Sequence, residues 1–497
     1  MITGVGPQSS LMVSALGDMR TRLTDLQRQL GTGQKSTTYA GLGIDRGLAV
    51  GLRGQLSAVN GYADTVTQIG VRMSVQQTSL ARIADLGSAV KGATVTQFDI
   101  DSSGQTATQR AAMSQLDEIL GLLNTPAGDR YLFSGRAGDQ PATDTLDHIL
   151  NGDGAKAGLK QIIAERNQAD LGANGLGRLV IPPPAGSQVT ISEETPPTVF
   201  GMKLASVSAL NGATVTGPSG SPASASVSFT SSPNPGDAIT FGFNLPDGTS
   251  QQVTLKATNS SPPAAGEFTI GANPNATAAN LQGSLVTAVQ KLAATSLSAA
   301  SAVAATNEFF NVDAGQPPMR VAGPPFTTAT ALVAGTAADT VIWYTGEMGA
   351  DPARGTAVAK VDDALSVSYG ARANEQAIRS TMANIAAYAV TTFSPGDPNA
   401  QDRFAALSER VRSGLAVPNG QQKIQDIQAE LAFAQTTVKD ATQRQGQRKM
   451  MLGDLLDSIE QAPQEQVAAQ ILALQTRLEA SLQTTSILYR LSIVNYL

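Results

Sequence analysis

The stretch LGDMRTRLTDLQRQL, residues 16–30, decides the fold class because its apolar side chains recur every three or four residues. That spacing places them on one narrow stripe of a helix, the pattern of a coiled-coil seam. Near the other end of the chain, VAAQILALQTRLEASLQTTSIL, residues 467–488, repeats the pattern. Both stripes lie close to the ends of the sequence, where most domains fray. A chain with a seam at each end is expected to pair its ends and join neighbouring molecules.

Two further helices in the sequence carry the same apolar stripe. One is expected at about 47–92, where Leu52, Leu56, Val59 and Val66 begin a strict alternation of four and three. The other follows Pro418-Asn419-Gly420 and runs from about 424 to 459 before Pro463. Its stripe includes the polar residues Gln445 and Arg448, and polar seam residues can fix the register of paired helices. A fifth pattern, Thr106 to Gln109, predicts a capping box at the start of another helix.

The middle of the sequence has a different composition. Between Gly201 and Gly315 there are only eight charged residues, and none is arginine. Alternating apolar residues predict strands at 224–229, 238–244 and 251–257, with a turn at Pro246-Asp247-Gly248. An Ala-, Ser- and Leu-rich helix is expected at about 277–305, and further strands at 341–344 and on both sides of Asp362-Asp363.

These patterns predict an α+β fold in which long, coiled-coil-like terminal helices form an elongated helical core and a β-rich domain is inserted centrally. The expected segments are a terminal helix and turn at 1–46, core helices and strands at 47–200, the β-rich insert at 201–315, a linker with a β-hairpin at 316–373, core helices at 374–462 and a final helix at 463–497.

Composition narrows the classes of partner. The net charge of −6 and the pI near 5.0 argue against nucleic acid, which requires a concentrated basic patch. No window approaches 18 consecutive apolar residues, so no membrane insertion is expected. The first twenty residues lack the basic and apolar regions of a cleaved signal peptide.

The residues of common catalytic and metal sites are scarce. Cysteine is absent, which removes disulfides and thiolate chemistry, and His148 is the only histidine. Asp99 and Asp101 begin like a calcium loop, but its twelfth position is Arg110 where a glutamate is required. We therefore expect no catalytic residues, no metal, no cofactor and no enzymatic activity.

The terminal stripes have two interpretations. They may form the buried face of a bundle within one molecule, which is the ordinary role of such a stripe, or they may contact other copies of the chain. The positions at the two ends favour the second interpretation. The expected assembly residues are Leu16, Met19, Leu23, Leu26, Leu30, Val467, Ile471, Leu474, Leu478, Leu488 and Leu491.

Three stretches give the chain a resemblance to a known family. QRQLGTGQKSTTYAGLGIDRG (27–47) resembles the turn between the first two core helices of bacterial flagellins. LQTRLEASLQTTSILYRLSIVNYL (474–497) and DRYLFSGRAGDQPAT (129–143) are similar to segments of the hook–filament junction proteins within that family. The resemblance covers about residues 1–145 and 341–497, and the segment from about 237 to 307 resembles an insert carried by some flagellins.

The resemblance implies an extracellular structural subunit of the flagellum. Such a subunit is exported unfolded through the flagellar type III system and assembles as a ring between hook and filament. Its partners would be copies of itself, the first hook-associated protein and flagellin. An export chaperone would cover the last helix, and the expected contacts are Leu474, Leu478, Leu482, Leu488 and Leu491.

Three other functions remain open at this point. A filament flagellin shares the terminal helices and differs in copy number. A secreted β-rich adhesin would use the Ser- and Thr-rich insert to bind a surface, and it leaves the terminal stripes unexplained. An enzyme would require a polar cluster in a pocket.

Overall fold

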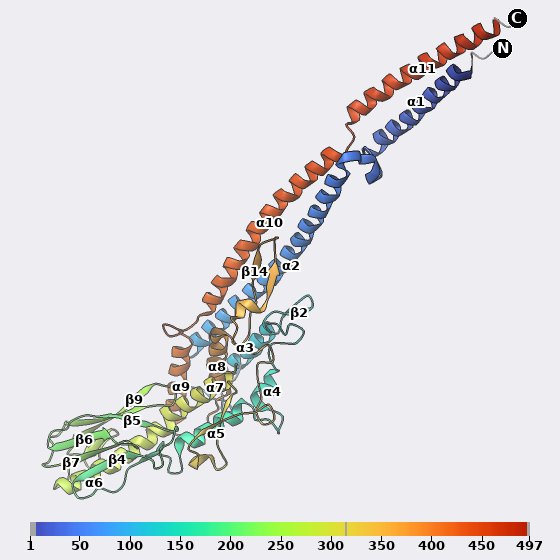
Figure 1. Ribbon diagram of the computed structural model, residues 1–497. Coiled ribbons are helices and arrows are strands. Elements are labelled where there is room, and N and C mark those ends of the chain that lie inside the picture. Colours follow the sequence, from blue (N-terminus) through green and yellow to red (C-terminus); the bar gives the residue numbers. More distant parts are fainter. Residues whose placement is uncertain (1–5, 314–315, 495–497) are drawn as a thin grey trace. The chain divides into compact units, whose positions relative to one another are not determined.

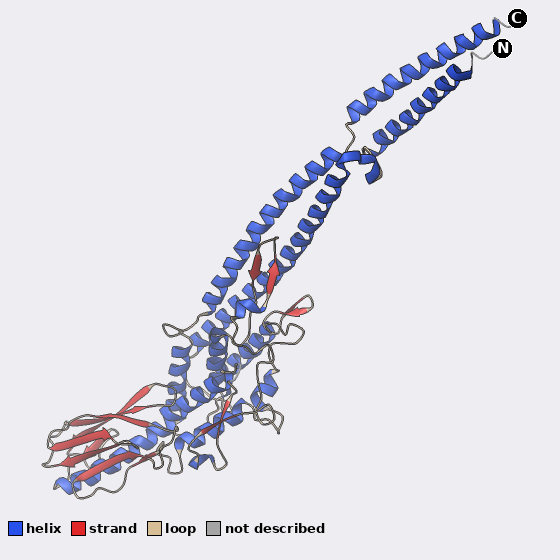
Figure 2. Ribbon diagram, viewed as in Figure 1, coloured by secondary structure: helices blue, strands red, loops and turns tan. Residues whose placement is uncertain are grey.

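The computed structural model describes residues 6–313 and 316–494 (Figure 1). The chain is a mixed helix and sheet protein with 52% helix and 16% strand, in agreement with the α+β prediction (Figure 2). It divides into two compact units. The terminal unit comprises the described residues up to Gln68, Lys360–Ser366 and those from Thr436 onward, and the central unit comprises Ile69–Ala359 and Val367–Gln435.

Long helices build the terminal unit. They are α1 (Gly6–Thr32), the first half of α2 (Arg46–Ala93), the second half of α10 (Ile424–Glu460) and α11 (Gln464–Val494), with the short 3-10 helix η1 (Tyr39–Asp45) between α1 and α2. Leu52 and Val59 of α2 are buried in one cluster with Leu452 and Ile459 of α10. The expected apolar stripes thus meet, and α2 and α10 form a pair of helices.

The two polar residues in the stripe of α10 bind a β-hairpin. This hairpin consists of β13 (Val358–Lys360) and β14 (Ser366–Ser368). The buried Gln445 donates a hydrogen bond to the carbonyl of Val361 at the hairpin tip. Arg448 pairs with Asp363 at 3.2 Å, and that carboxylate also accepts a hydrogen bond from Tyr62 of α2. Gln445 and Arg448 therefore hold the hairpin on the helix pair.

A group of shorter helices forms the helical part of the central unit. They are α3 (Ala107–Leu123), α4 (Leu146–Asn151), α5 (Leu159–Leu171), α7 (Ser298–Phe310), α8 (Gln376–Val390) and α9 (Ala400–Gly414). Helix α8 packs on α3 and α7, and α7 also packs on α5 and α9. The capping box predicted at the start of α3 is confirmed, because Thr106 and Gln109 satisfy each other's backbone amides.

Two four-stranded sheets occupy the rest of the central unit. One has the order β10 (Glu267–Thr269), β9 (Ser250–Thr258), β8 (Ala238–Asn244) and β5 (Lys203–Val207), and the other has the order β3 (Leu179–Val180), β4 (Gln188–Glu193), β7 (Ser224–Phe229) and β6 (Ala213–Ser219). Helix α6 (Pro274–Leu292) contacts both sheets and continues through η2 (Ala293–Leu297) into α7. The alternating apolar residues of both sheets and the buried stripe of α6 share one hydrophobic cluster.

The remaining strands and 3-10 helices are short. They are β1 (Pro126–Ala127), β2 (Arg130–Tyr131), β11 (Met319–Val321), β12 (Leu332–Ala334), η3 (Phe326–Thr328) and η4 (Ala353–Thr356). The strand predicted at 341–344 is wrong. Trp343 and Tyr344 are buried by aromatic packing, with the Trp343 ring 5.3 Å from that of Phe310, and only Tyr344 forms an isolated bridge.

Charged side chains connect the sheets to the neighbouring helices. Arg410 of α9 pairs with Asp247, in the turn between β8 and β9, at 2.7 Å, and both side chains are buried. Arg166 of α5 pairs with the buried Asp170 at 2.9 Å, and the other carboxylate oxygen of Asp170 accepts a hydrogen bond from the Gly201 amide. Because removing one partner of a buried ion pair leaves an uncompensated charge, these contacts fix the attachment of the strands.

The segment DRYLFSGRAGDQPAT (129–143) joins distant parts of the sequence within the central unit. Ser134 forms an antiparallel bridge with Arg372, and the Ala373 amide donates to the Phe133 carbonyl at 2.8 Å. Gln76 of α2 donates to the carbonyl of Leu132 at 3.1 Å. The segment therefore contributes to the packing of the central unit.

Candidate assembly surface

The two terminal helices pack on each other within one chain. Leu23 and Leu26 of α1 pack against a buried cluster formed by Ala462, Val467 and Ile471 at the start of α11. Further along, the Thr485 hydroxyl lies 3.8 Å from the sulfur of Met12. The stripes read from the sequence therefore face each other in the single molecule.

The predicted assembly residues occupy this internal contact to different degrees. Val467, Ile471 and Leu478 are buried, whereas Leu16, Met19, Leu23, Leu26 and Leu474 are half-buried and Leu30 is 40% exposed. The side chains of Leu488 and Leu491 lie outside the described residues. Whether these residues also touch another copy stays a prediction, because the stripes are already in contact within one chain.

Large apolar side chains also lie on other faces of the same helices. Leu472 and Ile487 of α11 are 65% and 57% exposed, and Leu11 and Val13 of α1 are exposed to a similar extent. On α11, Leu472 and Ile487 lie on the side opposite the stripe that contacts α1, because each residue advances 100° around a helix. Thr476, Glu479 and Gln483 lie between them on the same side, so Leu472 and Ile487 are separate apolar side chains that stay exposed in the single chain.

These exposed side chains were not predicted from the sequence, because they lie outside the single phase of the three–four repeat that defines the stripe. The available signal was the occurrence of Leu472 and Ile487 between the stripe positions.

The residues expected to contact an export chaperone also differ in how exposed they are. Leu482 is 46% exposed and accessible in the single chain. Leu478 is buried and Leu474 is half-buried, so a partner could cover both side chains fully only after α1 and α11 separate. Leu488 and Leu491 again lie outside the described side chains.

The turn between α1 and α2 carries another exposed apolar residue. Ile44 in η1 is 98% exposed. Nearby, Arg53 of α2 lies over the ring of Tyr39 at 5.6 Å and pairs with Glu460 of α10 at 2.6 Å. Hydrogen bonding to Glu460 raises the pKa of Arg53 above its ordinary value. These contacts hold the turn against the α2–α10 pair and leave Ile44 in solvent.

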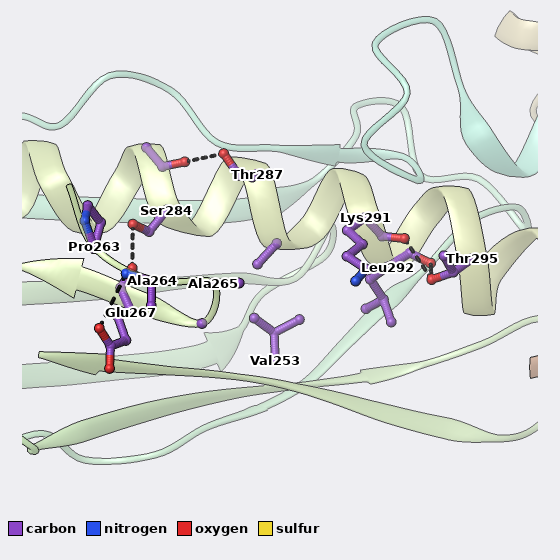
Figure 3. Close-up of a pocket in the computed structure, with 13 residues that line it drawn as sticks. Val253, Pro263, Ala264, Ala265, Glu267, Ser284, Thr287, Lys291, Leu292 and Thr295 are labelled. Carbon is purple, nitrogen blue, oxygen red and sulfur yellow. Dashed lines mark hydrogen bonds between the residues drawn. The ribbon is translucent and has the colours of Figure 1, made fainter. Parts of the chain in front are cut away.

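A pocket in the central unit is lined mainly by small, uncharged residues. It has a volume of about 510 Å³ and lies between α6 and β9 together with the loop before β10 (Figure 3). Small side chains such as Ala264, Ala288 and Ser284 line it, and its charged residues are Glu267 and Lys291. Lys291 is paired with Asp402 at 2.8 Å. The lining offers no nucleophile with a neighbouring base.

His148 is engaged with neighbouring carboxylates near the start of α4. Its Nδ1 atom contacts Asp144, and its Nε2 atom lies 3.6 Å from Asp153. Across residues 6–313 and 316–494, no set of three or more histidine, aspartate or glutamate side chains is placed to hold a metal ion. None of the helices in this part of the chain has the length and apolar character needed to cross a lipid bilayer.

Comparisons with models of protein families, with curated proteins and with solved structures gave no match to this chain.

Proposed function

We propose that this protein is a structural subunit of the bacterial flagellum that forms the ring between hook and filament. In this proposal the terminal helices behave as coiled-coil-like assembly elements, and the strand-rich central part is an insert that faces outward. The subunit is secreted without a cleaved signal through the flagellar type III system and works outside the cell. It has no catalytic activity and needs no cofactor.

The exposure of Leu472 and Ile487 on one side of α11 is the observation that carries the proposal. Fully burying a leucine or isoleucine side chain contributes about 1.5–3 kcal/mol. Leu472 and Ile487 forgo much of that stabilisation in the single chain, and so do Leu11 and Val13 of α1. A second copy that packs on this face would recover it, and the contact would extend along the α1–α11 pair.

The three stretches that resemble flagellin-family segments support the particular assembly. The ending at 474–497 and the segment 129–143 favour the junction proteins, while the strand-rich middle resembles an insert of some flagellins. The partners follow from that resemblance: copies of the chain, the first hook-associated protein, flagellin, and an export chaperone on the last helix. Filament flagellin is the alternative.

Charged substitutions on the exposed face test the assembly step. Replacing Leu472 and Ile487 with glutamate should abolish assembly of the purified protein, because two buried carboxylates would have no partners. The control replaces the exposed Gln470 and Gln475 of the same helix, which lie away from that side, with glutamate, which adds equal charge. Negative-stain microscopy and sedimentation measure assembly, and far-ultraviolet circular dichroism checks that both variants stay helical. Normal assembly of the Leu472 and Ile487 variant would contradict the proposal.

Immunogold labelling of intact cells distinguishes the two flagellar assignments. An antibody raised against residues 201–315 should label only the joint between hook and filament. Labelling along the whole filament would instead identify a filament flagellin. A complete absence of label on flagella would remove both assignments and favour the adhesin.

A further inference from the structure

Two linkers interrupt the helices of the terminal unit, and they are hydrogen-bonded to each other. Residues 33–38 follow α1, and residues 461–463 join α10 to α11. The Lys35 amide donates to the Glu460 carbonyl at 2.8 Å, and the Ala462 amide donates to the Gly33 carbonyl at 2.8 Å. Gln34 and Gln461 thereby form an antiparallel β-bridge. The two linkers therefore lie next to each other in the terminal unit.

Separate apolar clusters lie on either side of this bridge. On one side, Val467 and Ile471 of α11 pack with Leu23 and Leu26 of α1. On the other, Leu52 and Val59 of α2 are buried with residues of α10. Among the described residues, these two clusters share no member, so each helix pair has its own apolar contact.

Ala462 is buried in the α1–α11 cluster and so belongs to that pair, whereas the other linker positions have more room. Gly33 has a φ of +70°, and a Cβ at that position would meet only the Gln464 side chain, at 3.8 Å. Gln34, Gln461 and Pro463 are exposed. Pro463 has no amide hydrogen and interrupts the hydrogen-bond ladder between α10 and α11. Rotation of the backbone at Gly33 would therefore meet little steric resistance.

We propose that the bridged linkers form a coupled hinge, about which the α1–α11 pair turns as one body relative to the α2–α10 pair. The β-bridge keeps the two linkers in step, so α1 and α11 remain packed while the pair reorients. The hinge is a property of the single chain and goes beyond the proposed function. It would let one subunit fit neighbours at different angles without opening its terminal contact.

Distances between spin labels in the full-length monomer test the hinge. The chain has no cysteine, so introduced cysteines are the only labelling sites. One doubly labelled variant carries Thr24→Cys on α1 and Arg477→Cys on α11, and a second carries Thr24→Cys and Lys449→Cys on α10. All three positions are exposed. We expect a narrow distance distribution within the α1–α11 pair and a broad one across the bridge.

Two results would overturn the hinge. A distribution across the bridge as narrow as the one within the pair would mean that the unit is rigid. A broad distribution within the α1–α11 pair would mean that the two helices move separately, so the linkers are not coupled. Circular dichroism of each labelled variant confirms that its helices are intact.

A disulfide tests the bridge on which the coupling depends. Residues 34 and 461 occupy a non-hydrogen-bonded antiparallel pair, for which the Cα atoms are about 4.5 Å apart, within the range of a disulfide. The Gln34→Cys, Gln461→Cys variant should form an intramolecular disulfide under mild oxidation. The control pair, Gln34→Cys with Lys449→Cys, should remain reduced. Equal yields in the two variants, or none in the first, would contradict the bridge.

Discussion

At the scale of single residues, buried amide side chains connect the irregular segments to the helices. Gln445 binds the Val361 carbonyl of the hairpin, and Gln76 binds the Leu132 carbonyl of the segment 129–143. Gln109 is buried and donates to the carbonyls of Tyr388 and Thr391, both at 2.8 Å. A carbonyl buried outside regular structure needs such a donor, which explains why glutamine occurs on otherwise apolar helix faces.

Gln109 should be among the most sensitive of these residues. Its side chain also accepts a hydrogen bond from the Thr106 amide at 3.0 Å. Gln109→Ala would remove the partner of two buried backbone groups and of the half-buried Thr391 carbonyl, so we expect the central unit to lose at least about 2 kcal/mol of unfolding free energy. Urea unfolding followed by the fluorescence of Trp343, the only tryptophan, measures the loss. Ser114→Ala, on the exposed face of the same helix, should change it by less than about 0.5 kcal/mol.

Glu308 should give the central unit a distinctive pH dependence. Burial raises the pKa of its carboxyl, although the nearby Arg166 opposes the shift. A raised pKa in the folded state means that the contribution of Glu308 to stability is fully present below the unfolded pKa of about 4.3 and is lost as the pH rises through the folded value. Relative to Glu308→Gln, the natural protein should therefore lose stability over that interval.

Urea unfolding of both proteins between pH 4 and pH 7, monitored by Trp343 fluorescence, measures this difference. Stability curves that stay parallel across the whole range would show that burial of Glu308 does not shift its titration. Arg166 keeps its contact with Asp170 in the Gln variant, so the ion pair beneath the strands is retained.

At the scale of helices and strands, the sequence correctly predicted the elements that show a regular pattern of apolar residues within their own length. Apolar residues spaced three and four apart predicted α1, α2, α10 and α11. Alternating apolar residues on both sides of a Pro-Asp-Gly turn predicted β8 and β9. The hairpin at Asp362-Asp363 was also predicted. The strand expected at 341–344 failed because Trp343 is buried by contact with Phe310, which lies 33 residues away, and local pattern cannot register such a contact.

The candidate surface was predicted less completely than the fold. The stripes on α1 and α11 were found, yet a repeat in one chain does not reveal whether its partner is in the same chain or in another copy. The strand-rich part shows a similar limit. Its hydrophobic cluster includes Leu179 of β3 and Ile191 of β4, which precede the expected boundary at 201. The boundary was placed where the charged residues become scarce, and the strands that share this cluster begin before that point.

The pairing of α1 and α11 can be tested without assembly. Leu478 is buried against α1, whereas Leu472 on the same helix is exposed. Leu474→Asp together with Leu478→Asp should lower the thermal stability of the helical signal in the monomer, because aspartate in an apolar contact loses its solvation. Leu472→Asp should leave that signal almost unchanged. Equal effects of the two variants on circular dichroism would contradict the observed arrangement of α11.

At the scale of the whole molecule, the two units differ in how much apolar surface they bury. Most of the buried apolar side chains in the described part of the chain belong to the central unit, where one cluster includes residues from seven strands and from α6, whereas the clusters described in the terminal unit, on its helix pairs, are small. Since burial of apolar side chains is the main favourable term in folding, the terminal unit should be the less stable of the two.

Urea unfolding of the full-length chain should therefore proceed in two steps. Helical circular dichroism should begin to fall at a lower urea concentration than Trp343 fluorescence changes, because Trp343 lies in the central unit and reports only on it. One substitution is expected to affect each step separately. Leu478→Asp should shift only the first transition, and Gln109→Ala should shift only the second. If the two probes gave coincident transitions that moved together in both variants, the chain would unfold as one cooperative body. The terminal helices would then draw their stability from the central unit rather than from their own small clusters.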